Sequence, residues 1–196
     1  MLPFFSILAF ALTAWPLSPA AAQAAAQPVR PPGAAVAGCP PLLDQRQPRL
    51  QDEMVQDLCR YAGQVVLIVN TASFCGFTPQ YRALERLHER YRARGFAVLG
   101  FPSNDFGQEA GTNAEIAQLC EGTFGVRFPM FTSSRVTGPE ANPVFAQLTR
   151  LAGPPRWNFH KYLIGRDGQL MASYPSAVAP DDTRLVSQIE RALAER

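Results

Sequence analysis

Two short aliphatic runs, separated by one amphipathic segment, constrain the fold of this chain more than any other feature. Residues 65–70 read VVLIVN and residues 96–101 read FAVLGF, without alternation of apolar and polar residues. Continuous apolar runs of this length are typical of strands that are covered on both faces. We therefore expect both runs to be strands in the interior of an α/β protein.

The segment between the two runs has the pattern of an amphipathic helix over residues 78–94. Tyr81 and Leu84 begin a series of apolar side chains at helical spacing, arginines lie opposite them, and Gly95 follows the segment. A strand, a helix and a second strand form a right-handed crossover between parallel strands.

Further helical and strand patterns follow along the chain. The expected elements are a helix opened by the capping box TNAE at residues 112–115, a helix over 143–151, strands over 159–164 and 169–174, and a helix from Asp181 or Asp182 to residue 195. This order predicts a thioredoxin-like α/β fold, in which helices flank a central mixed β-sheet.

The composition is that of one globular domain with an appendage. The chain has 196 residues, of which 47% are apolar and 17% are charged, and its formal net charge is only +2. The sequence contains no run of like charge and no basic stripe, so we do not expect nucleic acid or an anionic surface as a partner.

The first 24 residues have the pattern of a secretory signal peptide. An apolar stretch over residues 1–15 is followed by PLSPAAAQA, which offers cleavage after Ala22 or Ala24. No Lys or Arg precedes the stretch, and an uncleaved anchor is the alternative, but Pro16 and Pro19 interrupt the apolar run. We expect cleavage and export to the periplasm.

The signal peptide is followed by an expected flexible lead-in over residues 25–45, and the folded domain is expected over residues 46–196. The first part of the lead-in is rich in Ala, Pro, Gly and Gln and has no periodicity. Export would place the four cysteines of the chain in an oxidising compartment, where disulfides persist.

Cys75 lies in the turn between the first strand and the helix, within the sequence NTASFCGFTPQY. A thiol at this place would meet unpaired N–H groups and the positive end of the helix dipole, which favour the thiolate. It does not belong to a Cys-x-x-Cys pair, because Thr78 stands where the second cysteine of such a pair would be. Cys75 is therefore either an activated nucleophile or a small cysteine that packs as a hydrophobe.

Two further segments follow or open buried strands, where α/β folds place their sites. The first contains Gln108 and the second contains Trp157 and Asn158. If the segments converge on Cys75, these side chains offer neutral hydrogen-bond donors to a thiolate and to a leaving oxygen, as attack on an O–O bond requires. Each residue alone also fits a purely structural role.

Four segments together resemble the glutathione peroxidase family: NTASFCGFTPQY, GFPSNDFGQE, RFPMF and WNFHKYLI. The resemblance extends from about residue 60 to the C-terminus. It implies a thioredoxin-like fold, the reduction of hydroperoxides without a cofactor, and a catalytic tetrad of Cys75, Gln108, Trp157 and Asn158, with sulfur in place of selenium.

The chain departs from the family pattern in the segment that carries Gln108. Ser103 stands where the family usually has Cys, Asp105 stands where it has Gln, and one residue is lacking between Gly107 and Gln108. Glu109 is the neighbour that could take the place of Gln108.

The resemblance also assigns a resolving role to Cys120, which would condense with a sulfenic acid on Cys75. The reductant is then expected to be a thioredoxin-like protein rather than glutathione, and the protein to be a monomer. We expect the helix that carries Cys120 to unwind locally for this bond to form. The alternative for Cys120 is an apolar core position beside Leu119.

Four cysteines allow three pairings. Pairing of Cys75 with Cys120 leaves Cys39 with Cys59 as a structural disulfide, and the alternative is that Cys39 stays unpaired in a tail. We expect no metal site, because neither His88 nor His160 has Cys, Asp or Glu at ligand spacing.

Two other functions remain open on the same fold. A thiol–disulfide oxidoreductase or copper chaperone would need a Cys-x-x-Cys or Cys-x-x-x-Cys pair, which the segment after Cys75 lacks. A redox-inactive binding module would not need Cys75, Trp157 and Asn158 together.

Overall fold

The computed structural model describes residues 38–109 and 111–195. The expected signal peptide at residues 1–24, and residues 25–37 of the expected lead-in, lie outside the described residues. Among the described helices, none is long and apolar enough to cross a membrane.

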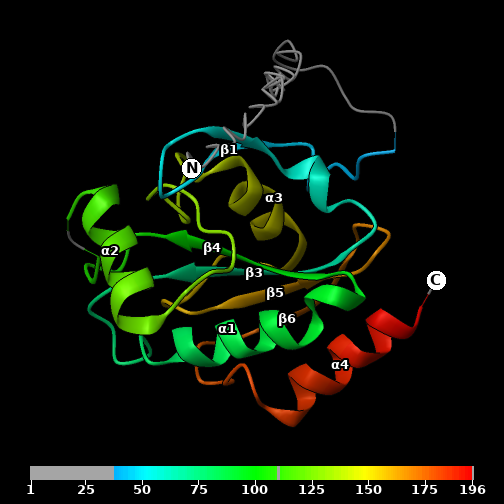
Figure 1. Ribbon diagram of the computed structural model, residues 1–196. Coiled ribbons are helices and arrows are strands. Elements are labelled where there is room, and N and C mark those ends of the chain that lie inside the picture. The colour runs from blue at the N-terminus through cyan, green and yellow to red at the C-terminus, as the bar shows by residue number, and fades with distance from the viewer. Residues whose placement is uncertain (1–37, 110, 196) are drawn as a thin grey trace, which may run out of the picture. The chain divides into compact units, whose positions relative to one another are not determined.

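The centre of the fold is a mixed four-stranded sheet with the order β4 (Phe96–Pro102), β3 (Val65–Thr71), β5 (Lys161–Ile164) and β6 (Leu170–Tyr174) (Figure 1). The two aliphatic runs are β3 and β4, and they pair in parallel, as expected of a crossover. β5 runs antiparallel to β3, and β6 antiparallel to β5.

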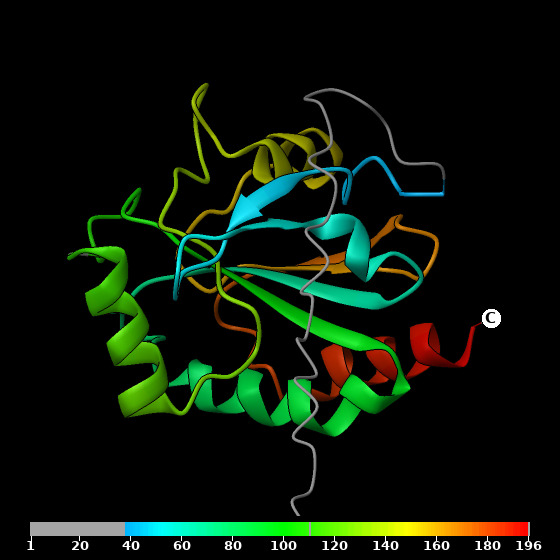
Figure 2. The same cartoon turned by 45° about the horizontal axis from the view of Figure 1, so that its top comes forward.

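Helices cover both faces of the sheet (Figures 1 and 2). α1 (Gln80–Tyr91) and α4 (Thr183–Ala194) lie on one face, and α3 (Pro143–Ala152) lies on the other. Leu67 of β3 belongs to the core on the α1 and α4 side, whereas Ile68 belongs to the core on the α3 side. The mixed thioredoxin-like sandwich is confirmed, and the two-sided burial explains why its strands lack alternation.

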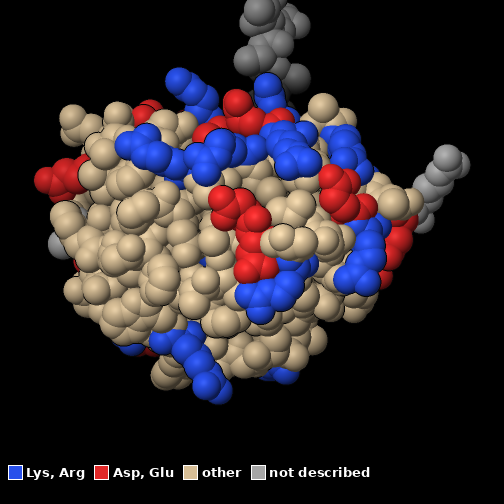
Figure 3. Space-filling view, turned by 90° about the horizontal axis from the view of Figure 1, so that it is seen from below, with Lys and Arg blue, Asp and Glu red and all other residues tan. Residues whose placement is uncertain are grey.

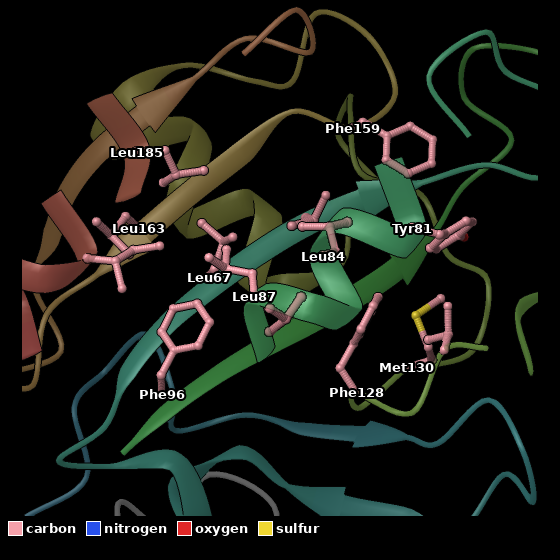
Figure 4. Packing of buried hydrophobic residues seen from close by; sticks show 14 of the residues in the cluster. Leu67, Tyr81, Leu84, Leu87, Phe96, Phe128, Met130, Phe159, Leu163 and Leu185 are labelled. Carbon is pink, nitrogen blue, oxygen red and sulfur yellow. The ribbon is translucent and has the colours of Figure 1, made fainter. Parts of the chain in front are cut away.

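The apolar stripe of α1 fixes this helix on the sheet. Leu84 and Leu87 lie beside Leu67 of β3 (Figure 4). Tyr81 packs instead against the ring of Phe159, at a centroid distance of 5.2 Å. The α-helix is shorter than the expected range 78–94, because it starts after Pro79 and changes to a 3-10 turn, η2 (Arg92–Arg94), before Gly95.

α2 (Asn113–Phe124) is held mainly at its ends. The expected capping box is formed, with the Thr112 hydroxyl and the Glu115 carboxylate each accepting the backbone N–H of the other residue. Gly125 ends the helix with a φ of 69°. Ile116 and Cys120 are the buried side chains of α2, and the partly buried Phe124 ring lies 5.4 Å from that of Tyr81, so limited apolar burial attaches this helix to the fold.

The segment before β3 contains a small antiparallel hairpin, β1 (Arg46–Pro48) and β2 (Val55–Asp57), followed by the short 3-10 helix η1 (Leu58–Tyr61). The sequence analysis did not foresee this hairpin. The last residues of the expected flexible lead-in, just before this hairpin, are packed: Leu42 and Leu43 are buried in the core on the α3 side.

A disulfide joins Cys39 to Cys59, with a Cα–Cα distance of 5.4 Å. This is the pairing that the sequence favoured as a structural disulfide. It ties the first described residues to η1 and encloses the β1–β2 hairpin in a covalent loop.

Candidate active site

The turn that carries Cys75 is built around the side chain of Thr78. The Thr78 hydroxyl accepts the backbone N–H of Cys75 at 3.0 Å and donates to the carbonyl of Ala72 at 2.9 Å. The Thr78 N–H in turn donates to the Cys75 carbonyl at 2.9 Å. A residue that replaces the second cysteine of a Cys-x-x-Cys pair therefore holds the turn that presents Cys75.

Cys75 is 7% exposed, and its sulfur is not in a disulfide. The backbone N–H of Phe77 donates to this sulfur at 3.3 Å. α1 begins only at Gln80, and the field of a helix terminus falls off within its first turn. The donor to the sulfur is thus an amide of the turn that precedes α1, so an N–H donor is present as expected, although the helix begins two residues later than expected.

The shortened loop after β4 brings Gln108 beside this turn. The Gln108 carbonyl accepts the N–H of Phe74 at 2.9 Å, and its side-chain oxygen accepts the Asn158 amide at 3.1 Å. Glu109 is buried, and its charge acts on Tyr81 and Cys120 instead. Of the two neighbours, Gln108 is the one that contacts Asn158.

Asp105 anchors the same loop from its other side. Its carboxylate accepts the backbone N–H groups of Val136 and Thr137 at 2.7 and 2.8 Å and the Thr137 hydroxyl at 2.9 Å. Arg135 lies 3.4 Å from the other carboxylate oxygen. The departure from the family pattern at this position therefore has a structural use.

Trp157 and Asn158 stand at the entrance to β5. Asn158 is completely buried, whereas Trp157 is 40% exposed and its ring lies 5.3 Å from that of Phe106. Phe159 has a φ of 64°, in the left-handed region that a bulky residue rarely adopts. The sequence predicted a strand from residue 159, but β5 consequently starts only at Lys161.

An open groove adjoins the Cys75 turn. It has a volume of about 380 Å³ and mostly apolar walls, which are formed by Ser73, Phe74, Gly111, Glu115, Ile116 and Leu119. The groove therefore lies between the turn and α2, the helix that carries Cys120.

Cys120 is buried and unbonded to another sulfur. Burial raises the pKa of its thiol to about 11, although the nearby Tyr81 hydroxyl acts in the opposite direction. Burial likewise raises the pKa of Tyr81 well above its ordinary value. At neutral pH the folded α2 therefore holds Cys120 as a neutral thiol, and a role in thiol chemistry requires its exposure.

The sequence segment around Cys75 is uncharged, since residues 70–81 contain no Asp, Glu, Lys or Arg. The face seen from below shows a strip of mixed charges and, to its left, a broad area without charged side chains (Figure 3). The donor that contacts the Cys75 sulfur is the backbone N–H of Phe77, and the expected donors Gln108, Trp157 and Asn158 are likewise uncharged.

One group of possible metal ligands occurs among the described residues: Cys39, Asp44 and Cys59. Both sulfurs of this group are joined in the disulfide and are therefore not thiolate ligands. His88 accepts the backbone N–H of Val98, and His160 shares a hydrogen bond with Ser173.

Sequence reasoning missed three buried polar residues near the site: Asn70, Thr78 and Lys161. Asn70 is completely buried at the end of β3, and the Lys161 ammonium donates to the Phe159 carbonyl at 2.7 Å. The signal was present, because Asn70 ends an otherwise aliphatic run and Lys161 follows WNFH directly. Buried polar groups of this kind need partners, and their partners lie in the site.

Known proteins share both the sequence and the fold of this chain. The sequence pattern of the family described as glutathione peroxidase matches residues 44–149. A hydroperoxy fatty acid reductase of Synechocystis is 46% identical over 145 residues, which cover 68% of this chain and 85% of that protein. A thioredoxin/glutathione peroxidase of Escherichia coli is 38% identical over 170 residues, which cover 74% of this chain and 93% of that protein.

A solved structure described as Trgpx in apo form superposes with a TM-score of 0.63 at 34% identity, and the match covers 79% of this chain and 95% of that one. The matched sequence pattern spans more than half of the chain, and it includes both Cys75 and Gln108. The chain therefore belongs to the glutathione peroxidase family, a family of peroxide-reducing oxidoreductases.

Proposed function

We propose that this protein is a two-cysteine thiol peroxidase in which Cys75 reduces hydrogen peroxide or organic hydroperoxides. The observation that carries the proposal is the hydrogen bond between Gln108 and Asn158 beside the Cys75 turn. Two amides from distant parts of the chain meet where a buried sulfur already receives an N–H. Neutral donors around a sulfur nucleophile suit a reaction that develops negative charge on oxygen.

In the first step the Cys75 thiolate attacks one oxygen of the hydroperoxide. An S–O bond forms and the O–O bond breaks, so the sulfur is oxidised to a sulfenic acid. The leaving oxygen takes up a proton and departs as water or an alcohol. The free amide N–H groups of Gln108 and the indole N–H of Trp157 are the donors available to this oxygen, since the Gln108 oxygen is engaged by Asn158.

In the second step Cys120 attacks the sulfenic acid. An S–S bond forms between the two sulfurs, and the hydroxyl of the sulfenic acid leaves as water after protonation. We propose that α2 opens for this step, because the folded helix buries the Cys120 thiol and keeps it neutral. The few buried side chains of α2, and Gly122 in its interior, make such opening inexpensive.

The third step returns both cysteines to thiols. A dithiol, or two thiols, reduces the disulfide by exchange and becomes a disulfide itself. We propose a thioredoxin-like protein as the donor and glutathione as the alternative, in keeping with the name of the Escherichia coli relative. We also propose that the chain acts as a monomer, since no step of this scheme requires a residue of a second subunit.

Organic hydroperoxides fit the apolar groove beside Cys75. Phe74, Ile116 and Leu119 form its apolar walls, and Glu115 is the one charged residue that lines it. An alkyl chain placed there would keep its peroxide group near the turn. The name of the Synechocystis relative supports the same class of substrate.

We further propose that the chain is exported to the periplasm after removal of residues 1–24. The N-terminal apolar stretch and the small residues that follow it support a signal peptide. The Cys39–Cys59 disulfide suits an oxidising compartment. Cell fractionation and mass spectrometry of the mature N-terminus test this, and an unprocessed chain in the cytosol would contradict it.

Stopped-flow measurement of peroxide loss tests the mechanism. Cys75→Ser should abolish reduction, whereas Cys120→Ser should consume one equivalent of peroxide and then lose turnover with a thioredoxin-type donor. The double variant Cys39→Ser/Cys59→Ser is the matched control and should keep full turnover. Wild-type rates in Cys75→Ser would overturn the proposal.

A further inference from the structure

The backbone conformation around Trp157 and Asn158 is unfavourable on its own and depends on contacts with the rest of the fold. Residues 157–160 precede β5 and belong to no helix or strand. Phe159, in their middle, has a φ of 64°, which is unfavourable for a bulky side chain. A conformation of this kind persists only when surrounding groups determine it.

Asn70 supplies three of the hydrogen bonds that determine this conformation. Its backbone carbonyl accepts the N–H of Phe159 at 2.6 Å. Its side-chain oxygen accepts the N–H of His160 at 3.1 Å, and its side-chain NH2 donates to the carbonyl of Trp157 at 3.2 Å. The amide therefore bonds the chain on both sides of Asn158.

The position of Asn70 in the sheet makes it a rigid support. It belongs to β3, which has β4 on one side and β5 on the other, and its side chain is completely buried. An amide at such a place is costly unless both of its ends are bonded, and an aliphatic residue would satisfy the strand equally well. The amide is thus explained by its bonds to residues 157–160.

We propose that Asn70 is a positioning residue of the peroxidase site, whose side-chain amide fixes the backbone that presents Trp157 and Asn158 to Cys75. The proposal rests on the proposed function for its catalytic consequence. β3 also leads directly into the Cys75 turn, so one strand aligns the nucleophile and two of its hydrogen-bond donors. Lys161 is a second support, through its bond to the Phe159 carbonyl.

The substitution Asn70→Asp separates positioning from packing. It keeps the shape of the side chain and the acceptor for His160, but it places an oxygen against the carbonyl of Trp157 in place of a donor. Asn70→Ser is a second variant that removes both side-chain bonds without adding charge. Val66→Ala, in the same strand and equally buried, is the control for a general loss of stability.

The experiment uses the full chain with Trp15→Phe in the background, so that Trp157 is its only tryptophan. Acrylamide quenching of Trp157 fluorescence reports its position, and single-turnover oxidation by hydrogen peroxide reports Cys75. Both Asn70 variants should increase the quenching and slow oxidation by about 10- to 100-fold, as displacement of a site by an ångström does. Val66→Ala should leave the quenching unchanged and the rate within about twofold, because a distant cavity does not move the site.

Wild-type quenching in both Asn70 variants would overturn the proposal, whatever their activity. A loss of rate that Val66→Ala shares at equal thermal stability would also overturn it, because the effect would then be general. Failure of the proposed function is recognised separately, since the protein with intact Asn70 would then not react with peroxide. The quenching comparison decides the positioning role in that case as well.

Discussion

The Thr78 hydroxyl accepts the backbone N–H of Cys75 at 3.0 Å and donates a hydrogen bond to the Ala72 carbonyl at 2.9 Å. Both partners of this hydroxyl lie in the turn that ends β3. The side chain at the position of a missing second cysteine therefore shapes the nucleophile's backbone instead of reacting with it.

Thr78→Val tests this relationship, because valine keeps the shape and removes both hydrogen bonds. The variant leaves a buried N–H and a buried carbonyl without these partners, so we expect a loss of about 1–3 kcal/mol in the free energy of unfolding. Oxidation of Cys75 should slow in addition. Urea unfolding and stopped-flow oxidation measure the two effects, and Thr78→Ser is the control that should restore both.

Asp105→Ala should loosen the loop that carries Gln108. Three hydrogen-bond donors, on Val136 and Thr137, lose their common acceptor. We expect destabilisation by about 1–3 kcal/mol and a slower oxidation step. Asp105→Asn offers an oxygen at the same place and should recover most of the stability. Equal behaviour of the two variants in urea would show that the carboxylate does not anchor the loop.

Gly122→Ala should slow the formation of the disulfide between Cys75 and Cys120. An added Cβ at this place meets no atom within 4 Å, so alanine stabilises α2 by about 0.5–1 kcal/mol. The open population of α2 then falls by about two- to fivefold, since 1.4 kcal/mol corresponds to tenfold. Rapid-quench thiol counting after one equivalent of peroxide measures the step.

The oxidation of Cys75 serves as the internal control for Gly122→Ala, because it does not require α2 to open. An unchanged rate of disulfide formation, in protein whose α2 is measurably more stable, would rule out local opening as the limiting event.

Lys161 makes the stability of the fold depend on pH. Burial lowers the pKa of its ammonium to about 7, below that of the unfolded chain near 10.4. Between these values the unfolded chain binds more protons, so this residue makes stability rise with pH, with a slope of up to about 1.4 kcal/mol per unit. Its contribution is lost as pH falls toward 7.

Lys161→Met removes this titration. The wild type should therefore gain stability relative to the variant as pH rises from 7 to 10. Urea titrations at four pH values measure this trend. A difference that is independent of pH over this range would show that Lys161 does not titrate as its burial implies.

Replacement of Cys39 and Cys59 by Ser should lower stability without loss of peroxidase activity. The disulfide closes a loop with a sequence separation of 20, for which about 2–4 kcal/mol is typical. Thermal unfolding measures the loss, and peroxide turnover serves as the control. A parallel loss of turnover at a temperature where the variant stays folded would assign this disulfide more than a structural role.

The sequence predicted the sheet well where burial was continuous, as in β3 and β4. It did not predict β1 or β2, because strands of three residues with mainly polar side chains carry no periodic signal. The late start of β5 was missed for another reason. Tertiary hydrogen bonds from Asn70 hold the segment in which Phe159 is left-handed, and a local pattern does not contain them.

The sequence named the residues of the candidate site but not the residues that hold them in place. Motif resemblance named Cys75, Gln108, Trp157 and Asn158, and the structure brings Gln108 and Asn158 together beside the turn. Local reasoning placed the sulfur at a helix end, whereas its donor is the N–H of Phe77. Residues that act through others, such as Asn70, become visible only when their partners are placed.

β3 lies between two neighbours in the sheet, whereas α2 attaches through its caps, two buried side chains and the partly buried Phe124. The backbone amides of β3 should accordingly exchange with solvent only on global unfolding, and those of α2 long before. Within one small domain, β3 is thus expected to be rigid and α2 to open easily. In the proposed cycle a single helix would open and refold, while the sheet that leads into the Cys75 turn keeps one conformation.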